Sequence, residues 1–447
     1  MIAITILCTI CNNGKQNTVG NKFMNAFCLI RNHSFLSQSA EDDIKVMHGM
    51  RSISAGLAVS LHVFLLTNWM GTGNALQVEK DMDKYKLTAI FHTELVVDTF
   101  LMMSGLLLIK SLMSAKTVNP FVLIAKRYLR LVWIMGLFTI VSMYVTLYCG
   151  DGPLWKIHVE KEVTACEMNW WPNFLMLGNY INTSNMCYPI LWTLPVDFHL
   201  YTVGIIIYWI FTKNRRAGLF TFFTLFLASI ITPGYVTYQR KLPATPSFDI
   251  KSMVNFRTEL FTNPTYIWTH LRAGPYFVGI MAGYFLSIYK PVNHRMTISK
   301  VTSSIVYTIA SIIAIMMLIM GGSFHDKSKP YDVWEAAIFA SVNRTVWAIA
   351  MACIIMLCEY GTVPLIGSFL SWPPWIPLSK LSYGVYLVHT LVFSCILVSM
   401  RFPLKHSLYL VLTHTMAVLV ISNLLSYILH LYFEAPMAKI FNILFYT

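Results

Sequence analysis

Charged residues are scarce in this chain. Only 12% of its 447 residues are Asp, Glu, Lys or Arg, about half the share that a typical soluble domain carries. At the same time 56% of the residues are hydrophobic, and the mean hydropathy is +0.59. So little charge on so apolar a chain excludes a soluble globular domain and a disordered segment. The composition therefore predicts an integral membrane protein.

The sequence also lacks the apolar–polar alternation that a membrane β-barrel requires, as the run "SSIVYTIASIIAIMMLIMGG" illustrates. It contains instead about ten apolar stretches of about 20 residues, each long enough to cross a hydrocarbon core of roughly 30 Å as a helix. Because helices satisfy their own backbone polar groups in lipid, we predict an all-α, polytopic membrane helical bundle. The expected spans are 52–71, 92–113, 122–148, 190–212, 217–236, 272–289, 301–321, 333–358, 381–400 and 408–432.

Acidic residues are fewer than basic ones, 20 against 33, which gives a net charge of +13. No basic motif resembles a nucleic-acid reader, so we expect the lipid bilayer and no nucleic acid as a partner. Many bases gather at one set of helix ends, which the positive-inside rule assigns to the cytoplasm, although the opposite loops carry some as well. We expect both termini in the cytoplasm and the chain in the plasma membrane or an endomembrane. The gathered bases include Lys45, Arg51, Lys126, Arg127, Arg130, Lys213, Arg215, Arg216, Lys300, Lys380 and Lys439.

Three of the nine cysteines fall in one long loop, 149–189, on the side opposite those bases. An oxidising compartment on that side favours a disulfide. We expect Cys166 to pair with Cys187, with Cys149 left over or pairing instead, and three free thiols as the alternative. The same loop contains Asn182 in an Asn-Thr-Ser sequence, so Asn182 is a candidate glycosylation site. We predict no metal site.

The ends of the chain are expected to lie outside the bundle. Residues 1–44 are predicted to be a polar lead-in, irregular over 13–48, because the apolar opening of about ten residues is too short to span. The transmembrane domain is predicted over 45–440, and 441–447 as a short tail. Prolines and tryptophans in 370–382 favour an interfacial elbow over a helix.

Ionisable residues inside the predicted spans are the main candidates for function, since each costs roughly 2.5–3.5 kcal/mol to insert. His62, His389 and Arg344 lie deep in their spans, whereas Glu94, Asp98, Asp197 and His199 enter from the outer side. Their depths overlap, which favours one shared polar cavity. An imidazole can act as a general base near neutral pH, and Asp197 or Glu94 would orient His62. The alternative is a histidine that packs between helices and bonds a carbonyl or hydroxyl group.

Arg127 and Arg130 are three residues apart and therefore share one helix face at the predicted cytoplasmic end. Two guanidiniums on one face suit bidentate capture of a phosphate. The alternative is that both anchor the helix to lipid headgroups. For Asp98 the alternative is a pair with Arg344 that has no role in chemistry.

Several motifs follow one another in a definite order along the chain. Arg51 precedes His62 by ten intervening residues, and Arg-x-x-Arg follows at 127–130. The further matching stretches are "VDTFLMMSG" (97–105), "WWPNFL" (170–175), "MC" (186–187), "WTLPVD" (192–197), "RAGPYFVG" (272–279), the 372–383 elbow with "SYGVYLVH" (382–389), and "FEAP" (433–436). Taken in this order, these motifs resemble the membrane acyltransferase 3 family, and its animal branch of nose-resistant-to-fluoxetine proteins most of all. The match runs from about residue 44 to 440.

The resemblance implies a ten-helix enzyme that moves an acyl group from an acyl-CoA-type donor to a hydroxyl of a lipid or small molecule. The donor is then a co-substrate, and no bound cofactor is expected. By position, His62 becomes the catalytic base or a transient acyl carrier, and Arg51, Arg127 and Arg130 bind the donor. The wider set of candidates is Asp197 and His389 as catalytic, Arg344 as substrate-binding, and Glu94, Asp98 and Glu434 as supporting residues.

Two other functions remain open at this stage. A transporter or carrier of lipids or xenobiotics would use the same polar cavity, but the paired halves typical of secondary transporters are not visible in the sequence. A catalytically silent relative is the other, because the proline that often follows the arginine pair is missing and His199 stands where the family commonly has Gln. Animal members also carry a cysteine-rich domain ahead of the first helix, so 1–44 is interpreted as the remnant of a longer N-terminal region.

Overall fold

The computed structural model describes residues 1–10, 19–40, 42–69, 72–82, 92–115, 119–246, 252, 254–289, 298–326 and 329–446. Within these ranges the chain forms helices and no β-sheet, and one isolated bridge joins Thr72 to Leu404. The prediction of an all-α polytopic bundle is therefore confirmed.

Nine helical segments among the described residues are long and apolar enough to cross a membrane. They are α4 (Val46–Trp69), α7 (Leu95–Ser114), α8 with its short continuation (Pro120–Tyr148), α10 with the turn before it (Pro189–Lys213), α11 (Arg215–Arg240), α16 (Lys300–Ser323), α17 (Val333–Tyr360), α19 (Trp375–Val398) and α20 with α21 (Leu408–Phe445). A tenth apolar helix, α15 (Gly274–Ile288), is shorter. These ten lie where the apolar stretches of the sequence lie.

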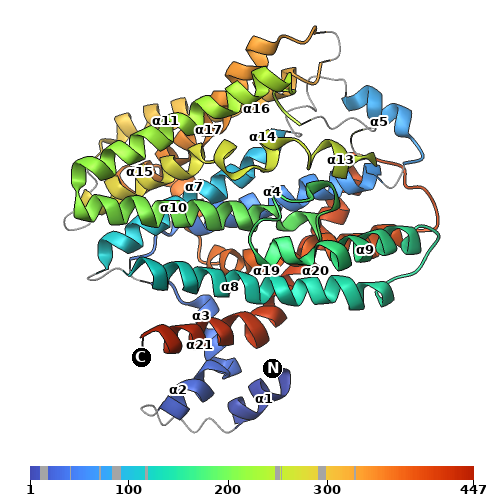
Figure 1. Ribbon diagram of the computed structural model, residues 1–447, viewed down its shortest axis with the longest axis horizontal. Coiled ribbons are helices and arrows are strands. Elements are labelled where there is room, and N and C mark those ends of the chain that lie inside the picture. Colours follow the sequence, from blue (N-terminus) through green and yellow to red (C-terminus); the bar gives the residue numbers. More distant parts are fainter. Residues whose placement is uncertain are drawn as a thin grey trace.

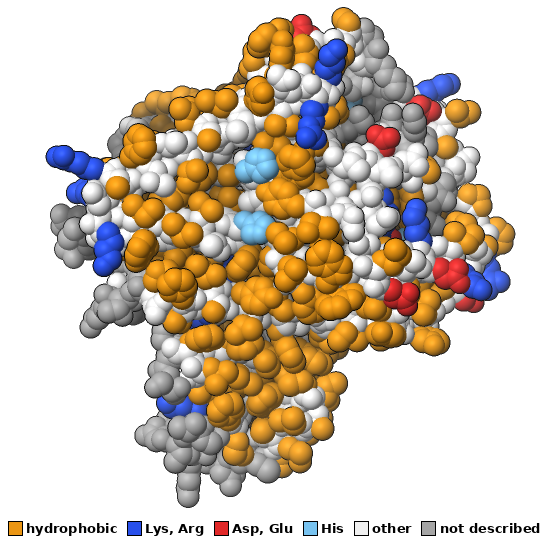
Figure 2. All heavy atoms as spheres, in the orientation of Figure 1, with side chains coloured by type: hydrophobic (Ala, Val, Ile, Leu, Met, Phe, Trp, Pro, Cys, Tyr) orange, Lys and Arg blue, Asp and Glu red, His pale blue; other side chains and the backbone are white. Residues whose placement is uncertain are grey.

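The long helices lie side by side along one common direction, which is horizontal in Figure 1. Helices α5 (Ala75–Met82), α9 (Trp155–Phe174) and α13 (Phe256–Glu259) lie towards one end of this direction, on the right. Figure 2 shows apolar side chains over the middle of this face, and many of its charged side chains towards the left and right ends. An apolar band between two polar ends is the surface that a bilayer requires.

Helices α7 and α15 pack against each other at the centre of the bundle. A Cβ atom at Gly105 would overlap the carbonyl oxygen of Tyr276, and one at Gly279 would overlap that of Met102. Glycine at both positions lets the two backbones touch, as small residues do between membrane helices. The α7–α15 pair therefore forms a rigid support for the residues around it.

The N-terminal region is more ordered than the sequence predicted. Helices α2 (Val19–Ala26) and α3 (Leu29–Ser37) lie within 13–48, and α1 (Ile2–Ile10) precedes them, so the prediction of irregular structure was wrong. Asn32 on α3 explains the order, because its amide donates to the carbonyl oxygen of Leu431 at 3.2 Å and its side-chain oxygen accepts from Lys439 Nζ at 2.6 Å. One contact with the turn that precedes the C-terminal helix and one with that helix thus hold this segment in place. That helix, α21 (Ala435–Tyr446), continues beyond the predicted boundary at 440.

The proline-rich elbow at 370–382 was also predicted too broadly. Helix α18 (Pro364–Leu370) ends there, but α19 already begins at Trp375 and contains Pro377 in its first turn. Proline is tolerated in that turn because the first N–H groups of a helix have no partner within the helix. Residues 375–382 of the predicted elbow are therefore helical, and α19 begins before its apolar run.

Candidate active site

Helices α4 and α19 bring the two deep histidines together. His48 Nδ1 lies 2.6 Å from Ser379 Oγ near the start of both helices, and His62 Nδ1 lies 2.8 Å from His389 Nε2 farther along. Residue numbers increase along both helices between these contacts, so the two helices run parallel. Their register places one imidazole directly against the other.

The hydrogen bonds of this histidine pair determine which ring nitrogens carry protons. His389 Nδ1 lies 3.0 Å from the carbonyl oxygen of Val385, and a carbonyl can only accept, so this nitrogen donates. In a neutral ring His389 Nε2 then accepts, which makes His62 Nδ1 the donor of the bond between the rings. The remaining nitrogen, His62 Nε2, keeps its lone pair and has no partner among the described residues. His62 is thus prepared to accept a proton.

His62 lines a cavity of about 170 Å³. Leu61 lies beside the histidine, and Leu65, Leu66 and Trp69 extend the wall along α4 for about two turns beyond it. Two loops that the sequence predicts on the outer side, 149–189 and 237–271, supply much of the rest, through α9 and the region around α13. The cavity therefore extends from His62 towards the end of the bundle where the sequence predicts the outer side.

Two polar groups from α9, Glu162 and His158, also line this cavity. Glu162 is bound by Arg257, whose Nη2 lies 2.6 and 2.5 Å from its two carboxylate oxygens. Burial lowers the pKa of the His158 imidazole below its usual range, although the nearby Glu162 carboxylate opposes the shift. Both groups therefore leave the cavity without an uncompensated charge near neutral pH.

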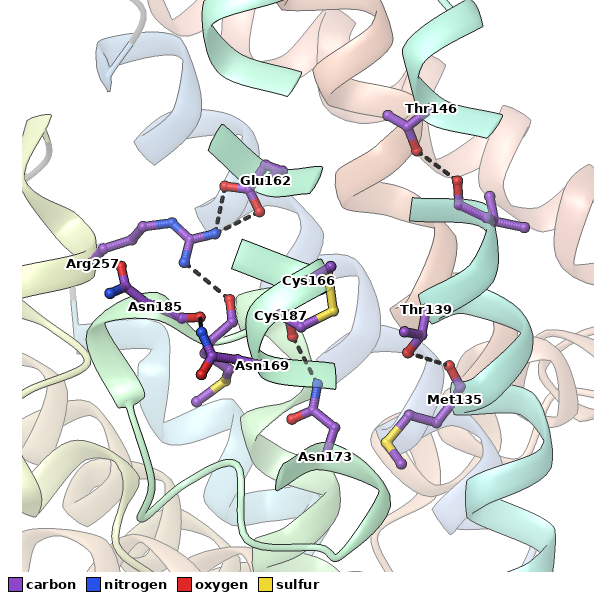
Figure 3. The surroundings of a disulfide bond; sticks show 12 residues. Met135, Thr139, Thr146, Glu162, Cys166, Asn169, Asn173, Asn185, Cys187 and Arg257 are labelled. Carbon is purple, nitrogen blue, oxygen red and sulfur yellow. Dashed lines mark hydrogen bonds and ion pairs between the residues drawn. A yellow bond between two sulfur atoms is a disulfide. The ribbon is translucent and has the colours of Figure 1, made fainter. Parts of the chain in front are cut away.

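The predicted cysteine pair holds this outer wall together (Figure 3). Cys166 on α9 is joined to Cys187 by a disulfide, and Cys149 takes no part in it. Asn173 Nδ2 donates to the carbonyl oxygen of Cys187 at 2.9 Å, and Arg257 Nη1 donates to that of Met186 at 3.0 Å. Since Arg257 belongs to the second outer loop and also binds Glu162 of the first, these bonds join the two loops over the cavity.

Helix α9 itself lies in a segment that the sequence treats as a loop. Its backbone leaves helical geometry at Asn169, three residues before Pro172, because the proline ring crowds the preceding turn. Asn169 accepts from the side-chain nitrogen of Asn182 at 3.0 Å. Asn182 is exposed, but the side-chain nitrogen that glycosylation would modify is the one that donates to Asn169.

A second group of candidate residues lies farther along the bundle, around Arg127. Arg127 Nη2 is 2.5 Å from Asp197 Oδ2, and Ser104 Oγ donates to the other oxygen of that carboxylate at 2.6 Å. Arg127 lies about 10 Å along α8 from its first residue, Pro120, and Asp197 about 24 Å along α10 from its last, Lys213. Arg127 therefore lies within α8 rather than at its end, whereas Asp197 is the fifth residue of α10 and lies near the start of that helix.

Arg130 and Arg51 complete this cationic group. Arg130 Nη2 lies 3.6 Å from Glu434 Oε1, and His430 Nδ1 lies 3.1 Å from the other oxygen of Glu434. Arg51 interacts electrostatically with Arg127, with Arg130 and with the Asp43 carboxylate, but it forms no ion pair in the described part of the chain. Three guanidiniums with two directly bound carboxylates attract a further anion.

Arg51 and His62 share one face of α4. Eleven residues turn a helix by about 1,100°, which is three full turns and about 20°, and advance it by about 16 Å. The cationic group at Arg51 and the cavity at His62 are therefore two sites on the same face of α4, about three helical turns apart.

Arg344 lies in a different place from the one its candidacy as a substrate-binding residue suggests. Its Nη2 is 3.8 Å from Glu94 Oε1, its Nε is 3.7 Å from Asp98 Oδ2, and its Nη1 donates to the carbonyl oxygen of Thr265 at 2.6 Å. Arg272 binds the same Asp98 at 3.1 Å and is fully buried. Two carboxylates thus neutralise two guanidiniums, and Arg344 does not line the cavity.

Sequence reasoning missed several residues of the site. Arg272 was noted only as part of a motif, because it lies at the edge of a predicted span. Tyr188, which donates to the carbonyl oxygen of Leu387 at 2.7 Å and contacts Thr390 Oγ1 at 2.6 Å, carries no such signal.

His199, which the sequence did single out, bonds Thr269 at 3.0 Å and lies outside the cavity lining. No group of three or more His, Cys, Asp and Glu side chains in the described ranges could hold a metal ion.

Comparisons with known proteins show to which family the chain is similar. A family model described as an acyltransferase domain matches residues 44–431. The chain is similar to nose resistant to fluoxetine protein 6 of Caenorhabditis elegans, with 24% identity over 456 aligned positions that cover 95% of this chain and 54% of that protein. It is also similar to regulator of hypoxia-inducible factor 1 of the same organism, with 26% identity over 253 positions, 50% of this chain and 47% of that one. The chain thus spans about half the length of the curated relatives it matches. No solved structure matches it.

Proposed function

Because the chain belongs to the acyltransferase 3 family, we propose that it is a membrane acyltransferase in which His62 is the general base. The observation that carries this proposal is the histidine pair at the cavity: His62 Nδ1 is bound to His389, and His62 Nε2 is left with its lone pair. A general base needs a free lone pair within reach of the proton that it removes.

We propose an acyl-CoA-type thioester as the donor. Its phosphates would bind Arg51, Arg127 and Arg130, where three guanidiniums lie within electrostatic range of one another. Its pantetheine arm would follow the shared face of α4 to His62, about 16 Å away. The donor then enters from the end of the bundle where α4 begins, which we assign to the cytoplasm. The acceptor enters from the opposite end, through the cavity.

The proposed reaction is the transfer of the acyl group to an acceptor hydroxyl. As His62 Nε2 takes the hydroxyl proton, the acceptor oxygen bonds to the thioester carbonyl carbon. The carbon–sulfur bond then breaks, and the departing thiolate receives the proton from His62. His389 remains neutral throughout and holds the His62 ring through its Nε2. Binding both substrates in one geometry supplies a further part of the rate.

Replacing His62 by asparagine tests this assignment. The asparagine amide can still donate to His389, as Nδ1 does, but nothing replaces the Nε2 lone pair. We expect His62→Asn to lower the transfer of radiolabel from acetyl-CoA and palmitoyl-CoA into extractable esters by at least about 100-fold. The assay uses purified protein in liposomes, with total membrane lipid and simple alcohols as acceptors.

The matched control is His414→Asn, since His414 on α20 bonds the carbonyl oxygen of Leu410 in its own helix and lies outside the cavity lining. That variant should transfer label at the wild-type rate. Binding of a thioether analogue of acetyl-CoA should be nearly unchanged in both variants. Undiminished transfer by His62→Asn would show that His62 is not the base, and movement of ligand without any thioester cleavage by the wild type would favour a carrier.

A further inference from the structure

The wall of the cavity contains a continuous row of aromatic rings. Neighbouring ring centroids lie 4.7 Å apart between His158 and Trp69, 5.7 Å between Trp69 and Phe256, and 6.0 Å between Phe256 and Phe261. The row continues with 6.2 Å between Phe261 and Tyr266 and 4.9 Å between Tyr266 and Trp192. All six rings line the cavity together with His62. We call them the aromatic wall.

The buried charge cluster behind the aromatic wall supports it. The Arg272 guanidinium lies 5.0 Å from the Trp192 ring and 5.3 Å from the Tyr266 ring, within the range of a cation–π contact. Arg272 is itself bound to Asp98, and its Nη1 donates to the carbonyl oxygen of Tyr266 at 3.1 Å. The ion cluster therefore holds two rings of the wall in place. Asp98 and Arg272 thus support the cavity wall although neither lines the cavity.

The rest of the lining consists largely of aliphatic and hydroxyl side chains, with Leu61, Leu65 and Leu391 among the aliphatic ones. The only carboxylate among the described lining residues is Glu162, and Arg257 neutralises it. No lysine or arginine is among those lining residues. An ion would have to give up its hydration in such a site without an opposite charge to pair with, which costs free energy. An uncharged ligand does not pay this desolvation cost of a charge.

The size of the cavity limits the ligand further. An engineered apolar cavity of about 150 Å³ in another protein accepts one benzene molecule. A volume of about 170 Å³ is therefore enough for one ring with a small substituent. Rings prefer to pack on other rings in edge-to-face or offset geometry, which a row of ring faces and edges offers along its whole length.

We infer that the acceptor is an uncharged compound with one aromatic ring and a hydroxyl group, a phenol or an aromatic alcohol. The ring packs between the aromatic wall and the leucines, and the hydroxyl points to His62 Nε2. This inference rests on the proposed acyl transfer for its reaction. The hydroxyl oxygen bonds to the acyl carbon of the thioester, the carbon–sulfur bond breaks, and the proton passes through His62 to the departing sulfur.

The test is photolabelling by a benzyl alcohol that carries a diazirine group, with the full chain in lipid nanodiscs and no acyl donor. Mass spectrometry locates the labelled residues. We expect label on the aromatic wall, and at least about threefold less label when phenylethanol competes. Octanol at an equal membrane concentration, and choline, should compete much less. Label spread over the lipid-facing helices, or equal competition by octanol, would overturn the inference.

Two variants sharpen the test. Phe256→Leu removes one ring at little change in volume and should lower wall labelling by about two- to tenfold. Leu65→Trp fills part of the cavity and should lower it as well. The control, Phe220→Leu, changes a phenylalanine on α11 that is 74% exposed, and should have no effect.

Labelling and transfer separate the two proposals, because labelling needs no reaction. His62→Asn should keep the labelling and lose the transfer. Specific labelling of the wall without any transfer by the wild type would contradict acyl transfer and support the ligand class. Transfer to an aliphatic alcohol without specific labelling would support acyl transfer and contradict the ligand class.

Discussion

At the scale of single residues, the proposed base His62 is bonded to a second histidine, His389. His389 uses Nδ1 to bond the Val385 carbonyl oxygen and Nε2 to accept from His62, so it has no nitrogen left for a substrate. His62 uses one nitrogen for His389 and presents the other to the cavity. In the proposed reaction His389 is therefore a positioning residue. Its effect on the reaction passes through the orientation of the His62 ring.

Substitutions of His389 should separate positioning from packing. The side-chain oxygen of glutamine can accept from His62 Nδ1 where His389 Nε2 accepts now, but leucine offers no acceptor. We expect His389→Leu to lower the rate of acyl transfer by about 10²-fold and His389→Gln to retain most of it. Both should melt at similar temperatures. Equal losses in the two variants would contradict a positioning role.

The sequence predicted that both histidines matter, but it did not predict that they meet. His62 and His389 are 327 residues apart, and their contact depends on the register between two helices that no local pattern reveals. The expected partners of His62 were carboxylates. Glu94 is instead bound to Arg344, and Asp197 to Arg127, because a buried guanidinium needs a carboxylate more than an imidazole does.

At the scale of elements, the glycines of α7 and α15 determine how closely these central helices approach. A Cβ atom at Gly279 would overlap the backbone of Met102, and one at Gly56 on α4 would meet no atom within 4 Å. The same substitution at the two positions therefore has opposite effects. In an open helical position alanine is favoured over glycine by about 0.5–1 kcal/mol, whereas overpacking costs about 1–3 kcal/mol.

We expect Gly279→Ala to lower the temperature of thermal unfolding in detergent, and Gly56→Ala to leave it unchanged or raise it slightly. Circular dichroism at a helix band follows both transitions. Unfolding of Gly279→Ala at the wild-type temperature would show that α7 and α15 can separate without cost, and that the close contact does not stabilise the bundle.

Apolar run length was enough to predict the helical bundle, because every span must bury its backbone in lipid. Run length did not predict helices that are stabilised by specific contacts rather than by an apolar sequence. Helix α9 is interrupted at Asn169 and is held by a disulfide and by side-chain amides. Because these contacts stabilise it, its sequence does not need the regular spacing of apolar residues by which helices are predicted. Helix α3 depends on partners near residue 431, which no local pattern can show. Helix α19 begins before its apolar run, since Trp375 and Pro377 fit its first turn.

At the scale of the whole molecule, one helix face joins two sites of opposite character. The cationic group of Arg51, Arg127 and Arg130 suits the phosphates of a donor, and the neutral aromatic cavity suits an apolar acceptor. His62 lies at the inner end of the cavity, three turns of α4 beyond Arg51. An enzyme that joins a cytoplasmic thioester to an acceptor from the other side of a membrane needs this separation.

The most direct test of that arrangement is a cryo-electron microscopy map of the full chain in nanodiscs with a thioether analogue of acetyl-CoA. We expect the phosphates of the analogue at Arg51, Arg127 and Arg130, and its acyl carbonyl beside His62 Nε2 in the cavity. Phosphates bound elsewhere, or an acyl end that stays outside the cavity, would contradict the proposal that one donor links the two sites.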